Sequence, residues 1–170
     1  MASPLHAGAS PGAPRPPLDR AACRGGRLSR LLRRLLAEAV AACRAAEGTF
    51  WVPSPTRAAL EGALNHGQTT DILETASVPM ADSVVGLVFC TGTAACIGPG
   101  DPHHPGVDEK TGLPTRAMAA APVRIGSDTV AVLSVINPSG GGVFSRVDLE
   151  ALEWKAYLAA LVIKDARDEP

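Results

Sequence analysis

Two apolar runs joined by a short turn place the strongest constraint on how this chain folds. They are Met118–Ile125 and Val130–Ile136, which are rich in Ala, Val, Leu and Ile and almost free of charge, with Gly126 and Asp128 between them. Apolar runs of this length around a short glycine-containing turn predict a β-hairpin. Because both strands are so apolar, we expect other elements to cover them. The glycines at 140–142 permit the positive φ that the next chain reversal needs.

Short motifs surround this hairpin in a fixed order. They are Ser83–Phe89 with Thr91-Gly92, Asp101–His104, Val107–Gly112, Thr115-Arg116, Ala121–Val123, Val130–Leu133, Asn137, Phe144 and Asp148. With these motifs in this order and spacing, the chain resembles a GAF domain from about Gly48 to Ile163.

The resemblance implies an α/β fold of the GAF/PAS-like α+β type. Its central antiparallel sheet would carry the N- and C-terminal helices on one face and the ligand-pocket loops on the other. A single GAF domain at 27–166 would follow a tail at 1–26 and precede a short C-terminal tail at 167–170. The first tail is rich in Pro, Gly and Ala with few large apolar side chains, which predicts disorder. A chain of 170 residues with 46% hydrophobic content is long and apolar enough to form the core of one such domain.

Helical periodicity marks both ends of the domain. Between Arg27 and Ala46, apolar residues at spacings of three and four predict a helix, and its arginines are expected to form a solvated face rather than a site for an acidic partner or membrane. A second helix should start at Ser145, a natural N-cap, and end at Ile163 or Lys164. Its expected apolar stripe consists of Leu149, Leu152, Ala156, Ala159, Ala160 and Ile163.

The region between these helices is less regular. Thr49–Val52 predicts a strand, and Ser54–Leu60 a capped helical turn with Pro55 in its first position. No strand is evident between Asn65 and Thr75, although the family pattern requires a second one. The expected elements that follow are an extended piece at Thr75–Met80, a helix Val84–Phe89 capped by Asp82 or Ser83, a short buried strand at Ala94–Ile97 and a loop from Gly98 to Gly106.

The resemblance implies a small-molecule pocket between the sheet and the loop Gly98–Arg116. Arg116 is the expected partner of any anionic group on the ligand, and Thr111 and Gly112 would shape the loop. Ligand binding would change loop closure, and with it the pairing of the terminal helices in a homodimer or with a separate signalling partner. The candidate ligand-binding residues are Phe89, His104, Asp108, Thr115, Arg116 and Met118.

A polar cluster in this loop also has the residue types of a metal site. Imidazole and carboxylate groups are competent ligands of zinc and similar ions. Adjacent histidines point in different directions in extended chain, however, and neither a third histidine nor a suitably spaced cysteine completes the set. We therefore expect no metal site among Asp101, His103, His104, Asp108 and Glu109.

The cysteines leave an enzymatic alternative open. One GAF subfamily reduces free methionine sulfoxide, and Cys90 and Cys96 would be the catalytic thiols of such an enzyme here. Their apolar sequence neighbours raise rather than lower a thiol pKa, which favours buried structural cysteines. A ligand-free dimerisation scaffold is a third possibility. The cysteines at 23, 43, 90 and 96 do not form the pattern of a secreted disulfide framework, so we expect reduced thiols in a cytoplasmic protein.

Charge and composition exclude other classes. A net charge of −1 argues against a nucleic-acid surface, and no apolar stretch is long enough for a membrane span. In the cyclic-nucleotide GAF signature, Lys follows the Asn and Glu follows the Asp, whereas here Pro138 follows Asn137 and Leu149 follows Asp148. The sequence thus names neither a ligand nor a cofactor. We expect no further module after the last helix, and therefore a non-enzymatic regulatory domain that signals through association.

Overall fold

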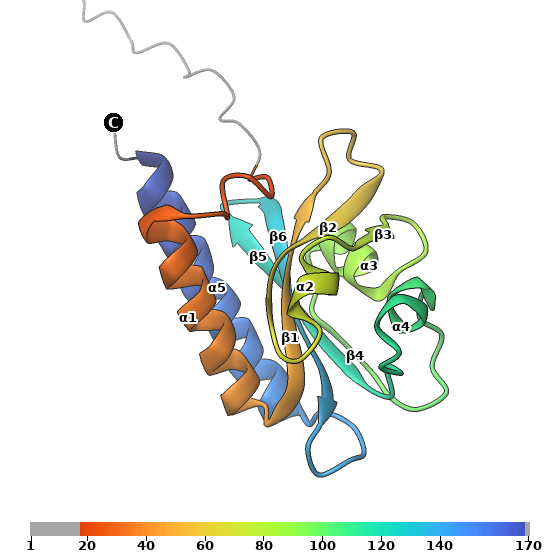
Figure 1. Ribbon diagram of the computed structural model, residues 1–170. Helices are drawn as coiled ribbons and strands as arrows, with labels where there is room; N and C mark the ends of the chain where they lie inside the picture. Colours follow the sequence, from red (N-terminus) through yellow and green to blue (C-terminus); the bar gives the residue numbers. More distant parts are fainter. Residues whose placement is uncertain (1–17, 169–170) are drawn as a thin grey trace, which may run out of the picture.

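A central antiparallel sheet forms the middle layer of the molecule (Figure 1). The structure is a computed structural model that describes residues 18–168. Within them the strand order is β3-β2-β1-β6-β5-β4, and every neighbouring pair is antiparallel. The elements are α1 Gly26–Ala42, β1 Ala45–Pro53, β2 Ala59–His66, α2 Thr70–Leu73, β3 Ser77–Pro79, α3 Val84–Thr91, β4 Ala95–Ile97, α4 Gly106–Thr111, β5 Met118–Ile125, β6 Asp128–Pro138 and α5 Arg146–Asp168.

The predicted hairpin is the strand pair β5–β6. Strand β5 has the predicted bounds, and β6 extends the second run by two residues at each end. Gly126 adopts φ 63° in the turn, a conformation that glycine takes at no steric cost. Opposite residues share a face: Ala121 and Leu133 lie on one side of the sheet, and Pro122 and Val132 on the other.

Helices α1 and α5 lie side by side and antiparallel on one face of the sheet, while α2, α3 and α4 lie on the other (Figure 1). This confirms the predicted layering. The main core forms between the helix pair and the sheet, where Leu36 of α1, Phe50 of β1 and Leu152 of α5 are fully buried. Lys155 links the two helices, since its Nζ lies 2.7 Å from Oε2 of Glu38.

Both terminal helices differ in length from the prediction. Helix α1 ends at Ala42 instead of Ala46, because Arg44 takes a left-handed backbone conformation, with φ 50°, and the chain turns directly into β1. The backbone N–H of Ser139 donates to the Arg44 carbonyl over 2.7 Å and holds this turn. Helix α5 continues past the predicted end, to Asp168.

The second strand lies earlier in the chain than expected. The predicted helical turn Ser54–Leu60 is wrong: a tight turn connects β1 to β2, and the Ser54 N–H donates to the Ala59 carbonyl over 2.9 Å. The Ser54 hydroxyl accepts from the Ala59 N–H over 3.3 Å, so it caps a hairpin turn, not a helix. Gly62 allows α2 to approach β2, because a Cβ there would lie 1.9 Å from the Leu73 carbonyl oxygen.

The predicted disordered tail at 1–26 is wrong for its last residues. Leu18 and Cys23 are 3% and 0% exposed and belong to the main core, and the Arg20 guanidinium donates to the Ala76 carbonyl over 2.8 Å. Burial raises the pKa of the Cys23 thiol to about 12. Residues 1–17 and 169–170 lie outside the described part of the chain. Between residues 18 and 168 no helix has the length and apolar character to cross a membrane.

Candidate ligand pocket

A pocket lies between the sheet and the short elements on its second face. The space between these elements is about 500 Å³, part of which is open solvent outside the pocket. The sheet forms its floor, α2, β3 and the start of α3 form its walls, and the segment around α4 covers its mouth. The lining residues are Thr49, Trp51, Leu73, Val78, Ser83, Val84, Val85, His103, His104, Val107, Asp108, Thr115, Met118, Ser134 and Ile136.

The floor is held by hydrogen bonds between its own polar groups. The Trp51 indole Nε1–H donates to Ser134 Oγ over 2.9 Å, and both residues are buried. The Thr49 hydroxyl donates to Asn65 Oδ1 over 2.8 Å. These polar atoms are therefore satisfied without a ligand, and the indole ring is fixed in place.

A buried carboxylate fixes the wall at α2. Glu47 is 2% exposed, and its oxygens accept from the Thr69 N–H over 3.0 Å, from the Thr69 hydroxyl over 2.5 Å and from the Asn65 side-chain amide over 3.3 Å. These bonds tie the residue before α2 to the first strand of the sheet. These polar contacts therefore help to position this wall, beside the buried side chain of Leu73.

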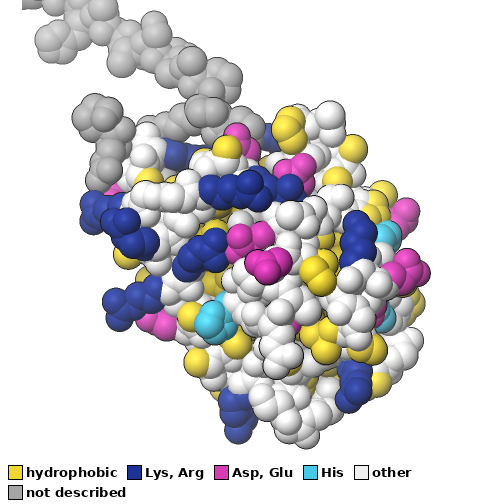
Figure 2. Space-filling model, viewed as in Figure 1, with side chains coloured by type: hydrophobic (Ala, Val, Ile, Leu, Met, Phe, Trp, Pro, Cys, Tyr) yellow, Lys and Arg dark blue, Asp and Glu magenta, His cyan; other side chains and the backbone are white. Residues whose placement is uncertain are grey.

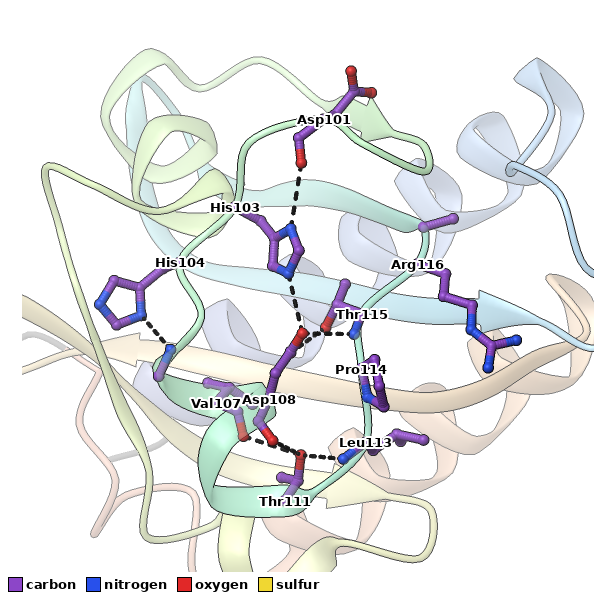
Figure 3. A network of polar contacts seen from close by, with 12 residues as sticks. Asp101, His103, His104, Val107, Asp108, Thr111, Leu113, Pro114, Thr115 and Arg116 are labelled. Carbon is purple, nitrogen blue, oxygen red and sulfur yellow. Dashed lines mark hydrogen bonds and ion pairs between the residues drawn. The ribbon is translucent and has the colours of Figure 1, made fainter.

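Asp108 is the centre of the polar network at the mouth (Figure 3). One of its oxygens accepts from the Thr115 hydroxyl over 2.7 Å. The other accepts from the Thr115 N–H over 2.7 Å and lies 3.1 Å from His103 Nε2. Burial raises the pKa of Asp108, but the bonds from Thr115 and His103 outweigh it and hold the pKa below its usual value. The ionised carboxylate therefore joins α4 to the segment that enters β5.

Part of the predicted loop is helical. Residues Gly106–Thr111 form α4, which ends at Gly112 with φ 67°, and the Gly112 N–H donates to the Asp108 carbonyl over 2.8 Å. The Thr111 hydroxyl donates to the Val107 carbonyl over 3.0 Å and accepts from the Leu113 N–H over 3.1 Å. Thr111 and Gly112 thus close the end of this helix, which agrees with the loop-shaping role expected for them.

The two histidines point in different directions (Figure 3). His103 lies between Asp108 and the Asp101 carbonyl, with its Nδ1 3.3 Å from that oxygen. His104 Nδ1 accepts from the Gly106 N–H over 3.2 Å, so in the neutral ring Nε2 carries the proton and can donate to a ligand. Across residues 18–168, no group of three or more His, Cys, Asp and Glu side chains is arranged to hold a metal ion.

Ser83, not Asp82, caps α3 at the pocket wall. Its hydroxyl accepts from the Gly86 N–H over 3.1 Å and donates to the Pro79 carbonyl over 2.6 Å. The helix continues to Thr91, two residues beyond the predicted end. Its first residues therefore face the pocket in a fixed orientation.

Four of the six predicted ligand-binding residues line the pocket: His104, Asp108, Thr115 and Met118. Phe89 is not among the lining residues and packs against the smaller core around Trp51. Arg116 is exposed and its side chain points away from Asp108 (Figure 3), while its backbone N–H donates to Asn137 Oδ1 over 2.8 Å. A role for any of them in binding a ligand stays a prediction.

The floor of the pocket consists of residues that were not predicted as ligand-binding from the sequence. Thr49, Trp51, Ser134 and Ile136 lie on β1 and β6 and face the side opposite the main core. The alternation of side chains along a strand could have identified these residues. The sequence neighbours of a core residue such as Phe50 must point to the other face of the sheet.

The prediction that Cys90 and Cys96 are buried is wrong, because both are exposed. Neither lines the pocket. Cys96 pairs with Ala119, a residue of the main core, and so lies on the face of the sheet that carries α5. Partial burial raises the pKa of the Cys96 thiol, and the negative charges of Asp148 and Glu153 raise it further.

Comparisons with known proteins agree with this architecture. The family model of the GAF domain matches residues 27–163, whereas none of the curated proteins matches the chain. The GAF-B domain of DevS from Mycobacterium smegmatis has a TM-score of 0.67 at 21% identity, covering 82% of this chain and 94% of that one.

Two further solved structures have the same fold. The GAF domain of a two-component sensor histidine kinase from Bacillus halodurans has a TM-score of 0.63 at 13% identity, covering 84% of this chain and 97% of that one. The type II free methionine-R-sulfoxide reductase from Thermoplasma acidophilum has a TM-score of 0.58 at 16% identity, covering 79% and 96%. At such identities the similarity establishes the fold alone.

Proposed function

The chain belongs to the GAF domain family, and we propose that it is a regulatory domain that binds a small molecule in the pocket beneath α3 and α4. The domain is proposed to act without catalysis and to signal by association, with itself or with a separate partner. The similarity to a sensor kinase domain is consistent with a sensory role. The observation that carries the proposal is the pocket itself, whose floor is rigid and whose cover is made of short, hydrogen-bonded pieces.

The lining suggests what kind of molecule the pocket receives. It contains Trp51, Leu73, Val78 and other apolar side chains but neither Lys nor Arg, so nothing in it pairs strongly with phosphate. His104 Nε2 remains able to donate a hydrogen bond. We therefore propose a small, largely apolar ligand with a hydrogen-bond acceptor. Within this proposal, the anion-holding role considered for Arg116 is not retained.

The signal is proposed to travel through β5. Asp108 binds Thr115, three residues before Met118, which lines the pocket at the start of β5. The next residue, Ala119, faces the main core, and β5 packs against α5. A ligand that closes α4 on the pocket would thus act on the strand that supports α5, and through it on the association of the helices.

Native mass spectrometry of freshly purified protein tests the binding step. We expect a mass excess in the native spectrum that disappears on denaturation. Val107→Trp fills the pocket from α4 and should abolish the excess. Leu113→Trp is the matched control, because Leu113 belongs to the same segment but is not among the lining residues. If both variants retain the excess, the bound molecule lies elsewhere.

A thermal-shift screen covers the case in which no ligand survives purification. A compound at one hundred times its dissociation constant stabilises the folded state by about 2.7 kcal/mol, which raises the melting temperature by several degrees. We expect hits among neutral apolar compounds, with the shift lost in Val107→Trp and kept in Leu113→Trp. Hits confined to organic phosphates would contradict the proposed ligand class.

A further inference from the structure

Glu74, the residue after α2, holds the end of this helix to the layer on the other side of the sheet. Its carboxylate accepts two hydrogen bonds from the Arg33 guanidinium of α1, over 2.8 Å at Oε1 and 3.2 Å at Oε2. The Asn65 N–H of β2 donates to the same Oε1 over 3.1 Å. Burial raises the pKa of Glu74, but the bonds from Arg33 and Asn65 outweigh it and hold the pKa below its usual value. The carboxylate is therefore ionised.

Two arginines that precede α1 bind the backbone of the same segment. The Arg24 guanidinium donates to the Glu74 carbonyl over 3.2 Å, and the Arg20 guanidinium donates to the Ala76 carbonyl over 2.8 Å. Together with Arg33, they hold the chain directly after α2 from three sides of its backbone and side chain. These contacts, here called the arginine clamp, involve Arg20, Arg24, Arg33, Glu74 and Ala76.

The clamp passes round the edge of the sheet at β2. Strand β3 pairs with the first three residues of β2, and the segment held by the clamp takes the next part of this edge. The Gly62 N–H donates to the Ala76 carbonyl over 3.0 Å, and the Asn65 N–H donates to Glu74. Helices α1 and α2 lie on opposite faces of the sheet (Figure 1), so this segment joins the main core side to the pocket side.

Helix α2 depends on contacts at its two ends for its position. A helix of four residues is too short to be stable alone, and the Thr69 side chain does not cap it. Its start is tied to the buried Glu47, which accepts from both the N–H and the hydroxyl of Thr69. Its end is tied by the clamp, where the Glu74 and Arg33 side chains are 18% and 43% exposed. The start is thus fixed inside the protein, whereas water can compete for the ion pair at the end.

The end of α2 is also a wall of the pocket. Leu73, the last residue of α2, lines the pocket and comes directly before Glu74. Its backbone packs so closely on β2 that a Cβ at Gly62 would lie 1.9 Å from the Leu73 carbonyl oxygen. Loss of the clamp would therefore free this wall to move away from β2. By the reciprocity of coupled equilibria, outward movement of the wall would also open the clamp.

The clamp also positions the segment before α1. Between residues 18 and 25 the chain forms turns, yet the Cys23 side chain is 0% exposed. Arg20 and Arg24 lie on either side of this cysteine in the sequence. Opening of the clamp would expose the Cys23 thiol. Cys43, just after the other end of α1, is 2% exposed in the main core and would stay buried.

We propose that the arginine clamp controls the position of the α2 wall, so that residues 18–33 regulate the pocket from the opposite face of the sheet. With the clamp closed, Leu73 stays against β2 and Cys23 is buried. With the clamp open, the wall moves outward, the pocket widens and Cys23 becomes accessible. This deepens the proposed function, on which it rests for its purpose, and makes Glu74 a positioning residue that acts on the pocket through Leu73.

Labelling of the two buried thiols with N-ethylmaleimide tests the proposal. The full chain with Cys90→Ser and Cys96→Ser retains Cys23 and Cys43, and mass spectrometry of their peptides gives the labelling rate of each. Glu74→Gln keeps the shape of the side chain but removes its charge. It should speed labelling of Cys23 about tenfold and leave that of Cys43 unchanged, because only a local opening exposes Cys23. Equal acceleration at both thiols, or none at Cys23, overturns the proposal.

Glu38→Gln is the matched control on the same helix. Glu38 pairs with Arg34 over 3.1 Å and with Lys155 over 2.7 Å, so its loss removes ion pairs of α1 without touching the clamp. Labelling of Cys23 should stay as in the parent protein. If Glu38→Gln accelerates it as much as Glu74→Gln does, the loss of any ion pair on α1 has this effect, and the clamp has no role of its own.

Gly62→Ala tests the coupling from the wall to the clamp. The added methyl group forces the Leu73 carbonyl away from β2 and should speed labelling of Cys23 about tenfold. In the Glu74→Gln background, where the clamp is already open, the same change should add less than about twofold. Fully additive effects would mean that wall and clamp move independently, and would overturn the proposal.

These labelling experiments require no ligand, so they separate this inference from the proposed function. A ligand in the native mass spectrum of a protein whose Cys23 responds to neither variant would count against the clamp alone. A clamp that behaves as expected, in a protein that binds no ligand in any assay, would count against the pocket alone.

Discussion

The two faces of the sheet are built on different principles. On one, the long helices α1 and α5 bury large apolar side chains such as Leu36 and Leu152 to 1% exposure or less. On the other, α2, α3 and α4 have four to eight residues each and border a smaller core around Trp51, and side chains such as Glu47, Ser83 and Asp108 add hydrogen bonds. The first face is filled, and the second leaves the pocket.

Charged side chains lie close together on the surface of α1. Arginines gather over α1 at the surface of the filled face, and acidic side chains lie beside them (Figure 2). Arg33 pairs with Glu74 over 2.8 Å and Arg34 with Glu38 over 3.1 Å, so much of this basic surface is neutralised within the chain. The difference between the faces suggests that stability depends mainly on the larger core, and that the short elements of the pocket face can rearrange at smaller cost.

The largest effect should come from the filled face. Phe50→Ala removes a fully buried ring from the main core and is expected to lower the free energy of unfolding by about 3–5 kcal/mol. Met118→Ala, at the half-buried pocket floor, should cost only about 1–2 kcal/mol, because it enlarges an existing space. Urea denaturation measures both. Equal losses would remove the distinction between the faces.

On the pocket face, Asp108→Ala should have the largest effect. It removes the acceptor of the Thr115 and His103 contacts, with an expected loss of about 2 kcal/mol. Hydrogen exchange should accelerate over residues 106–116 and stay unchanged in α1 and α5. Glu109→Ala is the control, since Glu109 is exposed on the same helix. Faster exchange throughout the molecule would show that residues 106–116 do not open independently of the main core.

Acidification should weaken the contacts that Asp108 makes with Thr115 and His103. Because the folded state lowers the pKa of Asp108, its contribution to stability is complete above the unfolded pKa of about 3.9 and is lost as the pH falls through the folded value. The stability gap between the wild type and Asp108→Asn should therefore be constant near neutral pH and shrink below about pH 4. A gap that widened on acidification would contradict this sign.

Loss of the α3 cap should have a smaller effect. Ser83→Ala is expected to cost about 1 kcal/mol, because the Gly86 N–H loses its acceptor. Asp82→Ala, one residue earlier, should change the free energy of unfolding little, since Asp82 is exposed. If ligand affinity falls in Ser83→Ala by more than stability predicts, the start of α3 also positions the ligand.

The smallest effect is expected at the exposed thiols. Cys90→Ser and Cys96→Ser should each change stability by less than about 0.5 kcal/mol and leave ligand uptake intact, because neither residue lines the pocket. Loss of a reductase activity towards free methionine sulfoxide in either variant would instead establish the enzymatic alternative.

Local sequence patterns were sufficient to predict a secondary-structure element wherever apolar residues recur at a regular spacing. The β5–β6 hairpin, the apolar stripes of α1 and α5, and a helix cap at Asp82 or Ser83 all follow from neighbours within a few positions. The motif order also identified the family, and with it the layers of the fold. Four pocket residues came from the family pattern around α4.

The errors occurred where distant parts of the chain decide the structure. Ser54 reads as a helix cap, yet it closes a hairpin, because β2 is stabilised by β1 and by the approach of α2 to Gly62. Leu18 and Cys23 lie in a stretch that looks disordered, yet they fill a gap in the core. Short-range preferences are weak compared with long-range burial, so they yield when the two conflict.

The sequence by itself determined the class of fold, the hairpin and the two terminal helices, because the regular spacing of apolar residues along the chain predicts which side chains are buried. Only the tertiary structure decided that Trp51 and Ser134 form a pocket floor, and that Arg116 is exposed and points away from Asp108. Each of these depends on which groups meet across the sheet. A contact between residues far apart in the chain leaves no periodic signal in either segment.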